Sequence, residues 1–200
     1  MSIYLGSEQV RLTQGEIVDI EPSVVREIIE GTISIYSNSR ISTVGNFAFG
    51  WCISLASVNL PQATTIGSSA FAYCFSLTSI SLPQVTSIGY GAFTDCSNLA
   101  SVNLPQATTI GSYAFQFCSS LTSISLPQVT TIGSNAFAYC SNLASVNLPQ
   151  ATSIGNYTFQ VCSSLTSISL PQVTTIGSGA FTYCRSLTSI SLPQVTAIGS

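Results

Sequence analysis

One interval of 22 residues recurs through most of this 200-residue chain and constrains its fold more than any other feature. Phenylalanine, proline and glycine recur at this step, and so does cysteine, at Cys52, Cys74, Cys96, Cys118, Cys140, Cys162 and Cys184. A period of this length is typical of a solenoid, in which each unit buries its apolar side only against its neighbours. The period therefore predicts a stack of similar turns around an elongated core.

The distribution of charge places one clear boundary in the chain. A degenerate unit, six full units and a partial unit follow one another at residues 33–54, 55–186 and 187–200. Nine of the eleven charged side chains lie in the first 40 residues. We therefore divide the chain into an N-terminal segment, 1–40, and a repeat array, 41–200.

Each unit contains the pattern of a short strand. In Leu77–Leu82, Ile80 would point to one face of the strand, and Ser79 and Ser81 to the other. Pro83 would end the strand, because proline has no backbone N–H to donate. Stacked in parallel, these strands predict a sheet with one apolar face and one hydroxyl-rich face.

The second half of each unit predicts turns. Gly89 suits a tight turn with positive φ. Ala92, Phe93 and Cys96 have the spacing of one helical or 3-10 turn whose apolar side faces inward. The array is thus expected to carry a parallel sheet on one face and short helical turns on the other.

The motif Ile-Gly-x-x-Ala-Phe-x-x-Cys-x-x-Leu-x-x-Ile-x-Leu-Pro resembles the BspA-like class of leucine-rich repeats, over residues 41–200. The period also lies within the range of about 20–29 residues for such repeats. The resemblance implies a curved, right-handed solenoid of α/β or mainly-β class. It further implies a bacterial surface or secreted protein with an adhesive role, which engages a host or cell-surface protein or a glycan.

The N-terminal segment differs in kind from the repeats. Residues 3–5 and 9–12 look like short strands, and residues 22–31 look like a short amphipathic helix. Terminal repeats need a cap with a polar outer face, and we interpret residues 1–40 as that cap. The alternative is that residues 1–40 form an attachment module. This alternative belongs to a second functional hypothesis, in which the chain is a structural spacer or attachment component of a phage tail or envelope assembly.

The two ends of the chain bear on its location and partners. The first residues form neither a basic segment nor an apolar stretch, so no signal peptide is predicted. No apolar run is long enough for a transmembrane helix. A surface or secreted location follows from the resemblance, while a virion or cytoplasmic location stays open. The array stops before its next Ala-Phe-x-x-Cys, so we expect the native chain to continue past Ser200 or this apolar edge to self-associate.

Residue types that support catalysis are nearly missing from the repeats. The sequence has neither His nor Lys, and Asp95 is the only acidic residue after residue 40. A general base, a Schiff-base lysine and a carboxylate pair are therefore not available there. We predict a non-catalytic protein without a cofactor. The net charge of −3 and the lack of a basic patch argue against nucleic acid as a partner.

The cysteine column has three interpretations. Zinc binding is disfavoured, because the chain has no Cys-x-x-Cys and only one cysteine per turn. Disulfides between neighbouring turns would have an allowed Cα separation, but stacked side chains point in parallel. We predict a buried column of free thiols that act as small apolar residues.

The position before each repeat cysteine is one of those that vary between repeats. It holds Trp51, Tyr73, Asp95, Phe117, Tyr139, Val161 and Tyr183. If they are exposed, the five aromatic residues are candidate ligand contacts, because aromatic side chains dominate interface energetics. The alternative is that these rings half-bury against neighbouring turns and only stabilise the solenoid. Tyr90, Tyr113 and Tyr157, shortly before the repeat phenylalanine, are candidates to extend the same patch.

Overall fold

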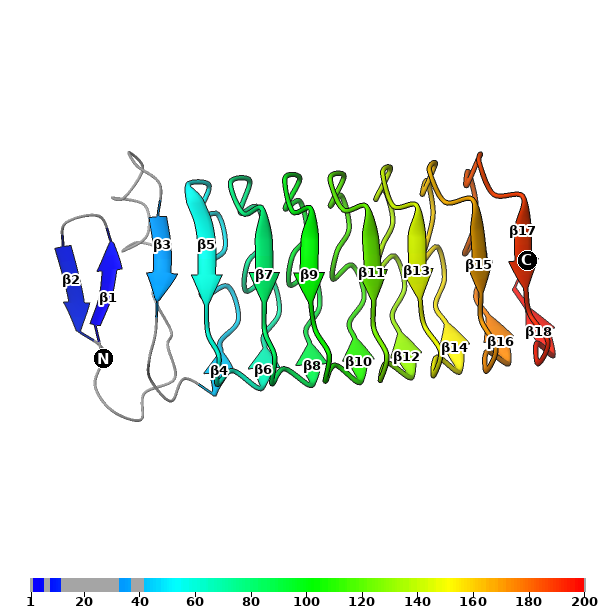
Figure 1. Ribbon diagram of the computed structural model, residues 1–200, viewed down its shortest axis with the longest axis horizontal. Helices are drawn as coiled ribbons and strands as arrows, with labels where there is room; N and C mark the ends of the chain where they lie inside the picture. Colours follow the sequence, from blue (N-terminus) through cyan, green and yellow to red (C-terminus); the bar gives the residue numbers. More distant parts are fainter. Residues whose placement is uncertain (1, 6–7, 12–32, 37–41, 200) are drawn as a thin grey trace.

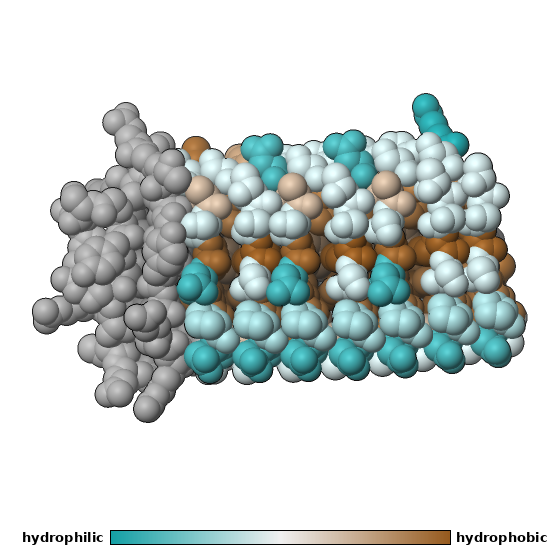
Figure 2. All heavy atoms as spheres, viewed as in Figure 1, coloured by the Kyte–Doolittle hydropathy of each residue, from teal (hydrophilic) through white to brown (hydrophobic). Residues whose placement is uncertain are grey.

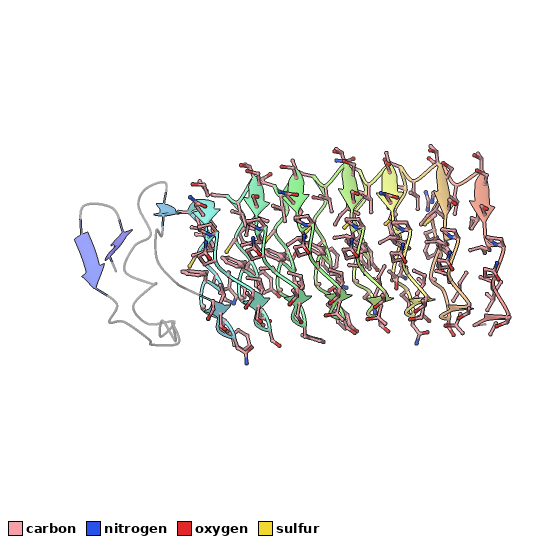
Figure 3. The ribbon with its side chains drawn as sticks, turned by 60° about the horizontal axis from the view of Figure 1, so that its bottom comes forward. Atoms are coloured by element: carbon pink, nitrogen blue, oxygen red, sulfur yellow. The ribbon has the colours of Figure 1, made fainter. Side chains whose placement is uncertain are left out.

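The computed structural model describes residues 2–5, 8–11, 33–36 and 42–199, and it describes side chains within 42–199. The expected helix at residues 22–31 lies outside the described residues. Within them, the chain forms a solenoid of parallel strands and turns (Figure 1). The turns follow one another in a nearly straight row in both ribbon views, whereas the resemblance implied a curve (Figures 1 and 3).

Both predicted N-terminal strands are present. Strands β1 (Ser2–Leu5) and β2 (Glu8–Arg11) pair as an antiparallel hairpin. The hairpin lies beside β3 (Ile33–Tyr36), and β3 pairs in parallel with β5 (Leu55–Asn59). The degenerate first unit therefore still supplies a strand to the array.

The predicted parallel ladder is confirmed. After β5 it continues through β7 (Ser79–Ser81), β9 (Ser101–Asn103), β11 (Ser123–Ser125), β13 (Ser145–Asn147), β15 (Ser167–Ser169) and β17 (Ser189–Ser191). Hydrogen bonds join these strands in three groups, β3 to β9, β11 with β13, and β15 with β17. In β7, Ile80 is buried between two exposed serines, as the alternation predicted.

A second parallel ladder was not predicted. It consists of two-residue strands that directly precede the repeat glycines: β4 (Thr43–Val44), β6 (Thr65–Ile66), β8 (Ser87–Ile88), β10 (Thr109–Ile110), β12 (Thr131–Ile132), β14 (Ser153–Ile154), β16 (Thr175–Ile176) and β18 (Ala197–Ile198). These eight strands form one sheet. A neighbouring line of threonine hydroxyls reinforces it, since Thr108 Oγ1 donates to the Thr86 carbonyl at 3.1 Å.

The helical turns predicted around Ala-Phe-x-x-Cys are wrong, because every described residue there lies in non-helical turns. Every second backbone N–H group in this segment donates a hydrogen bond to a carbonyl of the next turn of the solenoid. Phe115 donates to the Ala136 carbonyl at 2.8 Å, and Phe117 donates to the Ala138 carbonyl at 3.0 Å. Those donors are unavailable for bonds along a helix, so the segment adopts tight turns instead.

The expected positive φ at Gly89 is also wrong. Among the described glycines only Gly91 and Gly179 have it. The reason for glycine in this column is close approach between turns. A Cβ at Gly89 would lie 2.6 Å from the carbonyl carbon of Gly67, and one at Gly133 would lie 2.4 Å from the Ser112 nitrogen.

Identical side chains stack in the core. The rings of Phe71, Phe93 and Phe115 are fully buried, with centroids 5.3 Å and 5.2 Å apart and nearly parallel planes. On the surface the same repetition produces rows of hydrophilic and hydrophobic side chains that run along the array (Figure 2). The sticks in Figure 3 show equivalent side chains of successive turns lying in line.

The last described turns are less buried than the middle ones. Ile190 and Ile198 are exposed, and Leu187, Leu192 and Val195 are only partly buried against the core. These side chains occupy positions that are buried in the central turns, where a following turn covers them.

Candidate binding surface

The position before each cysteine forms one continuous column, which we call the aromatic stripe: Trp51, Tyr73, Asp95, Phe117, Tyr139, Val161 and Tyr183. Backbone bonds hold its members in register. The N–H of Tyr73 donates to the Thr94 carbonyl, and that of Asp95 donates to the Gln116 carbonyl, both at 2.8 Å. Each member is thereby fixed beside the turn that carries the next one.

The stripe is exposed to different degrees along its length. Trp51 and Tyr183 are 63% and 61% exposed, Phe117 and Tyr139 are 38% and 36% exposed, and Tyr73 is half-buried. The ring of Trp51 stacks on that of Tyr73, with centroids 3.9 Å apart and planes 12° apart. Phe117 stacks on Tyr139 at 4.6 Å and 21°. The stripe therefore consists of two stacked pairs and a terminal tyrosine, separated by Asp95 and Val161.

Every member of the stripe has a left-handed backbone. Its φ values lie between 59° at Asp95 and Val161 and 66° at Trp51. Only glycine, asparagine and aspartate adopt this conformation readily, and for bulky or β-branched residues it is a rare outlier. Asp95 is the only stripe member of that kind, so six of the seven positions carry a side chain that the local backbone disfavours.

The tyrosines that were expected to extend the patch form a separate group. Tyr90 and Tyr113 contact each other, with centroids 5.1 Å apart. Tyr157 covers Gly179, where an added Cβ would lie 2.4 Å from the tyrosine Cε1. Among the described residues no ring contact joins these tyrosines to the stripe. Tyr113 and Tyr157 share a column two residues after the repeat glycine, and Tyr90 lies in the adjacent column, one residue after it.

The sequence reasoning missed three exposed apolar side chains. Ile53 and Phe75 lie two positions after stripe residues, and the ring of Phe75 meets that of Tyr73 edge-on at 6.2 Å. Phe47 is exposed in the column of Tyr113 and Tyr157. The corresponding positions in later turns hold serine in four cases and arginine once, so departures from the repeat pattern would have revealed Ile53 and Phe75.

The predicted burial of the cysteine column is confirmed. Six thiols are buried and Cys184 is partly buried. Each thiol after the first donates to the carbonyl of the phenylalanine one turn back, as Cys118 does to Phe93 at 3.2 Å and Cys140 to Phe115 at 3.1 Å. Burial raises the pKa of Cys140 from 9.0 to about 12. A buried thiol with a raised pKa is a poor nucleophile, which fits a structural role.

Charge is sparse on the array. The carboxyl group of Asp95 lies within the aromatic stripe and has no hydrogen bond or ion pair to any described residue. Partial burial raises the pKa of this carboxyl above its usual value of 3.8. Arg185 is exposed two residues after Tyr183.

The described residues offer little material for other kinds of site. They contain no group of three or more His, Cys, Asp or Glu side chains placed to hold a metal ion. A search of the described residues also finds no helix with the length and apolar character to cross a bilayer. The outer face of the β5–β17 ladder is uniform, with exposed serines and asparagines such as Asn103, whose Nδ2 donates to Ser81 Oγ at 3.1 Å.

Solved structures similar to this chain include two bacterial leucine-rich repeat proteins. A leucine-rich repeat protein of T. pallidum is 30% identical, with a TM-score of 0.66, over 84% of this chain and 77% of its own. A leucine-rich repeat protein of Eubacterium ventriosum is 31% identical, with a TM-score of 0.69, over 78% of this chain and 43% of its own. The chain therefore spans less than half of the second protein.

More distant likeness supports the fold alone. The pneumococcal vaccine antigen PcpA is 19% identical, with a TM-score of 0.54, over 80% of this chain and 56% of its own. A search of curated proteins gave no significant match. The family described as "BspA type Leucine rich repeat region (6 copies)" matches residues 30–127 and 86–200, which together exceed half of the chain. This chain belongs to the BspA-type leucine-rich repeat family.

Proposed function

We propose that this chain is a non-catalytic binding module of a bacterial cell-surface or secreted protein, and that it engages a host or cell-surface protein or a glycan through the aromatic stripe. One observation carries the proposal. Rings occupy a column whose left-handed backbone favours glycine or asparagine, exposed at Trp51, Phe117, Tyr139 and Tyr183 and half-buried at Tyr73. A ring there costs conformational energy, so its presence calls for a benefit from the side chain.

Packing supplies only part of that benefit. The pairs Trp51–Tyr73 and Phe117–Tyr139 gain stacking energy of about 0.5–1.5 kcal/mol each. Tyr183 makes no ring contact with any described residue and is 61% exposed, so stacking gives it no compensation. Exposed aromatic groups supply much of the binding energy at interfaces, which favours a contact role for the stripe.

The repetition of the array suits binding by many weak contacts. Rings recur along one edge at intervals set by the turns, and each offers a similar contact. Several such contacts made together raise the effective affinity well above that of one contact. A repetitive ligand, such as a fibrous protein or a glycan chain, fits this arrangement best.

A structural role is the second candidate. The nearly straight array and the hairpin beside β3 support a spacer or attachment component of a phage tail or envelope assembly (Figure 1). In that role residues 1–40 would attach the array to its neighbours. In the binding role they would cap its first turn.

A binding panel tests the proposal. Immobilised matrix proteins, mucin and glycans are exposed to the purified chain and to a variant in which the five stripe aromatics are changed to Asn, which tolerates the left-handed backbone. The matched control changes five exposed serines of the β5–β17 ladder to Ala, at Ser79, Ser123, Ser145, Ser167 and Ser189. Circular dichroism establishes that all three proteins fold.

We expect the chain and the serine control to bind the same panel members and the stripe variant to lose that binding. Binding that survives in the stripe variant would contradict a role for the stripe. No binding by any folded protein would contradict the binding role and favour the spacer.

A further inference from the structure

In the aromatic stripe, Asp95 occupies the turn between Tyr73 and Phe117, the inner members of the two stacked pairs. In both stacked pairs the ring planes are close to parallel, 12° apart in one pair and 21° in the other. Stacking between successive turns uses one face of each ring. The other face of the Tyr73 ring and the other face of the Phe117 ring are on the side of the Asp95 turn. That turn carries no ring in this column.

We call the space between the rings of Tyr73 and Phe117, at the turn of Asp95, the notch. The spacing of the repeat gives its width. The phenylalanine ladder advances by 5.3 Å from Phe71 to Phe93 and by 5.2 Å from Phe93 to Phe115. The rings of Tyr73 and Phe117 are two turns apart, and each is drawn toward its stacked partner, at 3.9 Å and 4.6 Å. Their centroids are therefore separated by about 11 Å. A cation at the midpoint would lie about 5.5 Å from both centroids, inside the limit of about 6 Å for cation–π attraction.

The turn between the two rings carries a carboxyl group, which we take as the floor of the notch. Asp95 is partly buried, and its carboxylate has no cationic partner among the described residues. It is the only acidic residue in the array. A carboxylate between two aromatic walls is complementary to a flat cation, which can lie within cation–π range of both rings and donate two hydrogen bonds to the carboxylate.

We propose that Tyr73, Asp95 and Phe117 form a receptor for an arginine side chain of a partner polypeptide. The inference rests on the proposed function and names the chemistry of the partner at one point of the stripe. Arginine fits better than lysine, because the guanidinium is planar and less strongly hydrated and forms paired bonds with a carboxylate. Phe75 contacts Tyr73 edge-on at 6.2 Å and packs against that wall.

The chain contains a matched control for this notch. Two stripe positions further on from Phe117, Val161 lies between Tyr139 and Tyr183 in the same register. Its walls are aromatic but its floor is apolar. Asp95→Asn removes the charge without disturbing the backbone, because both residues tolerate positive φ. Val161→Asp places a carboxylate between Tyr139 and Tyr183, again with a residue that tolerates positive φ.

The test is an NMR titration of the full chain with the peptide acetyl-Gly-Arg-Gly-amide. The same peptide with citrulline in place of arginine has nearly the same shape without the charge. We expect the arginine peptide to shift the amide signals of residues 94–96 with a dissociation constant in the millimolar range. We expect the citrulline peptide and Asp95→Asn each to weaken binding at least tenfold, and Val161→Asp to add a second set of shifted signals at residues 160–162.

Three outcomes would overturn the inference: no shift at residues 94–96, equal binding of the citrulline peptide, or equal binding by Asp95→Asn. Stronger binding of tetramethylammonium than of the arginine peptide would also overturn the choice of arginine. The binding panel distinguishes failure of the arginine receptor from failure of the proposed binding function. Panel binding that needs the stripe aromatics but survives Asp95→Asn would leave the proposed function standing and reject the arginine notch.

Discussion

At the scale of single residues, the stripe shows a conflict between backbone and side chain. Trp51, Phe117 and Val161 have φ values of 66°, 61° and 59°, where asparagine or glycine would be less strained. Sites of this kind persist only where the surrounding structure imposes them. In the stripe, hydrogen bonds to the neighbouring turns hold the left-handed backbone in place. The Val161 N–H, for example, donates to the Thr182 carbonyl at 2.9 Å.

Val161→Asn tests whether this strain is real. Val161 is a half-buried β-branched residue in a left-handed conformation, and asparagine relieves the strain while exposing no ring. We expect the free energy of unfolding to rise by about 1 kcal/mol, measured by urea denaturation. The control is Gln160→Asn, at a neighbouring position without positive φ, which we expect to change little. A loss of stability in Val161→Asn would show that packing of the valine outweighs the strain.

The buried thiols predict how stability depends on pH. Burial raises the pKa of Cys140 from 9.0 to about 12, and that of Cys52 to about 12 as well. Between these values the unfolded chain loses its thiol protons while the folded chain keeps them. The free energy of unfolding should therefore be constant below about pH 8 and fall as the pH rises above 9.

Urea midpoints at pH 7.5 and pH 10.5 measure this fall, and Cys140→Ala should make it smaller by removing one of the titrating groups. An equal fall in Cys140→Ala and in the unmodified chain would show that other groups cause it.

At the scale of elements, the sequence predicted strands better than turns. The alternation in Leu77–Leu82 identified the strand β7 because burial on one face determines which residues point inward. The spacing of Ala92, Phe93 and Cys96 predicted a helical turn incorrectly. Inward-facing residues have the same spacing in the observed turns, and the sequence gives no sign that alternate N–H groups bind the next turn. The register of the stripe was predictable from the period, but its left-handed backbone was not.

The glycine column was recognised for the wrong reason, and this difference can be tested. Gly133 has no positive φ, but an added Cβ would lie 2.4 Å from the Ser112 nitrogen. Gly133→Ala must therefore push two turns apart, and we expect it to lower the free energy of unfolding by about 3 kcal/mol.

Gly50→Ala is the matched control, because its nearest neighbour would be the Ser69 carbonyl oxygen at 3.3 Å. Its effect should be below about 1 kcal/mol. Similar effects of the two substitutions in urea denaturation would argue against close approach as the reason for glycine in this column.

At the scale of the whole molecule, each turn contacts only its neighbours, so whole turns can be removed. Deleting residues 99–120 joins Asn98 to Leu121 and keeps the 22-residue register. Tyr139 then follows Asp95 in the stripe, and the notch regains an aromatic wall. Deleting residues 99–142 joins Asn98 to Leu143 and places Val161 after Asp95, so one wall is lost.

Both shortened chains should fold, with circular dichroism spectra like that of the full chain. The first should bind the arginine peptide within about threefold of the full chain, and the second should bind it at least tenfold more weakly, because cation–π attraction from one side is lost. A third chain, lacking residues 99–109, breaks the register and should not fold cooperatively. Equal binding by the two register-preserving chains would contradict the aromatic walls. Loss of binding in both would instead show that the notch depends on more than the two rings beside Asp95.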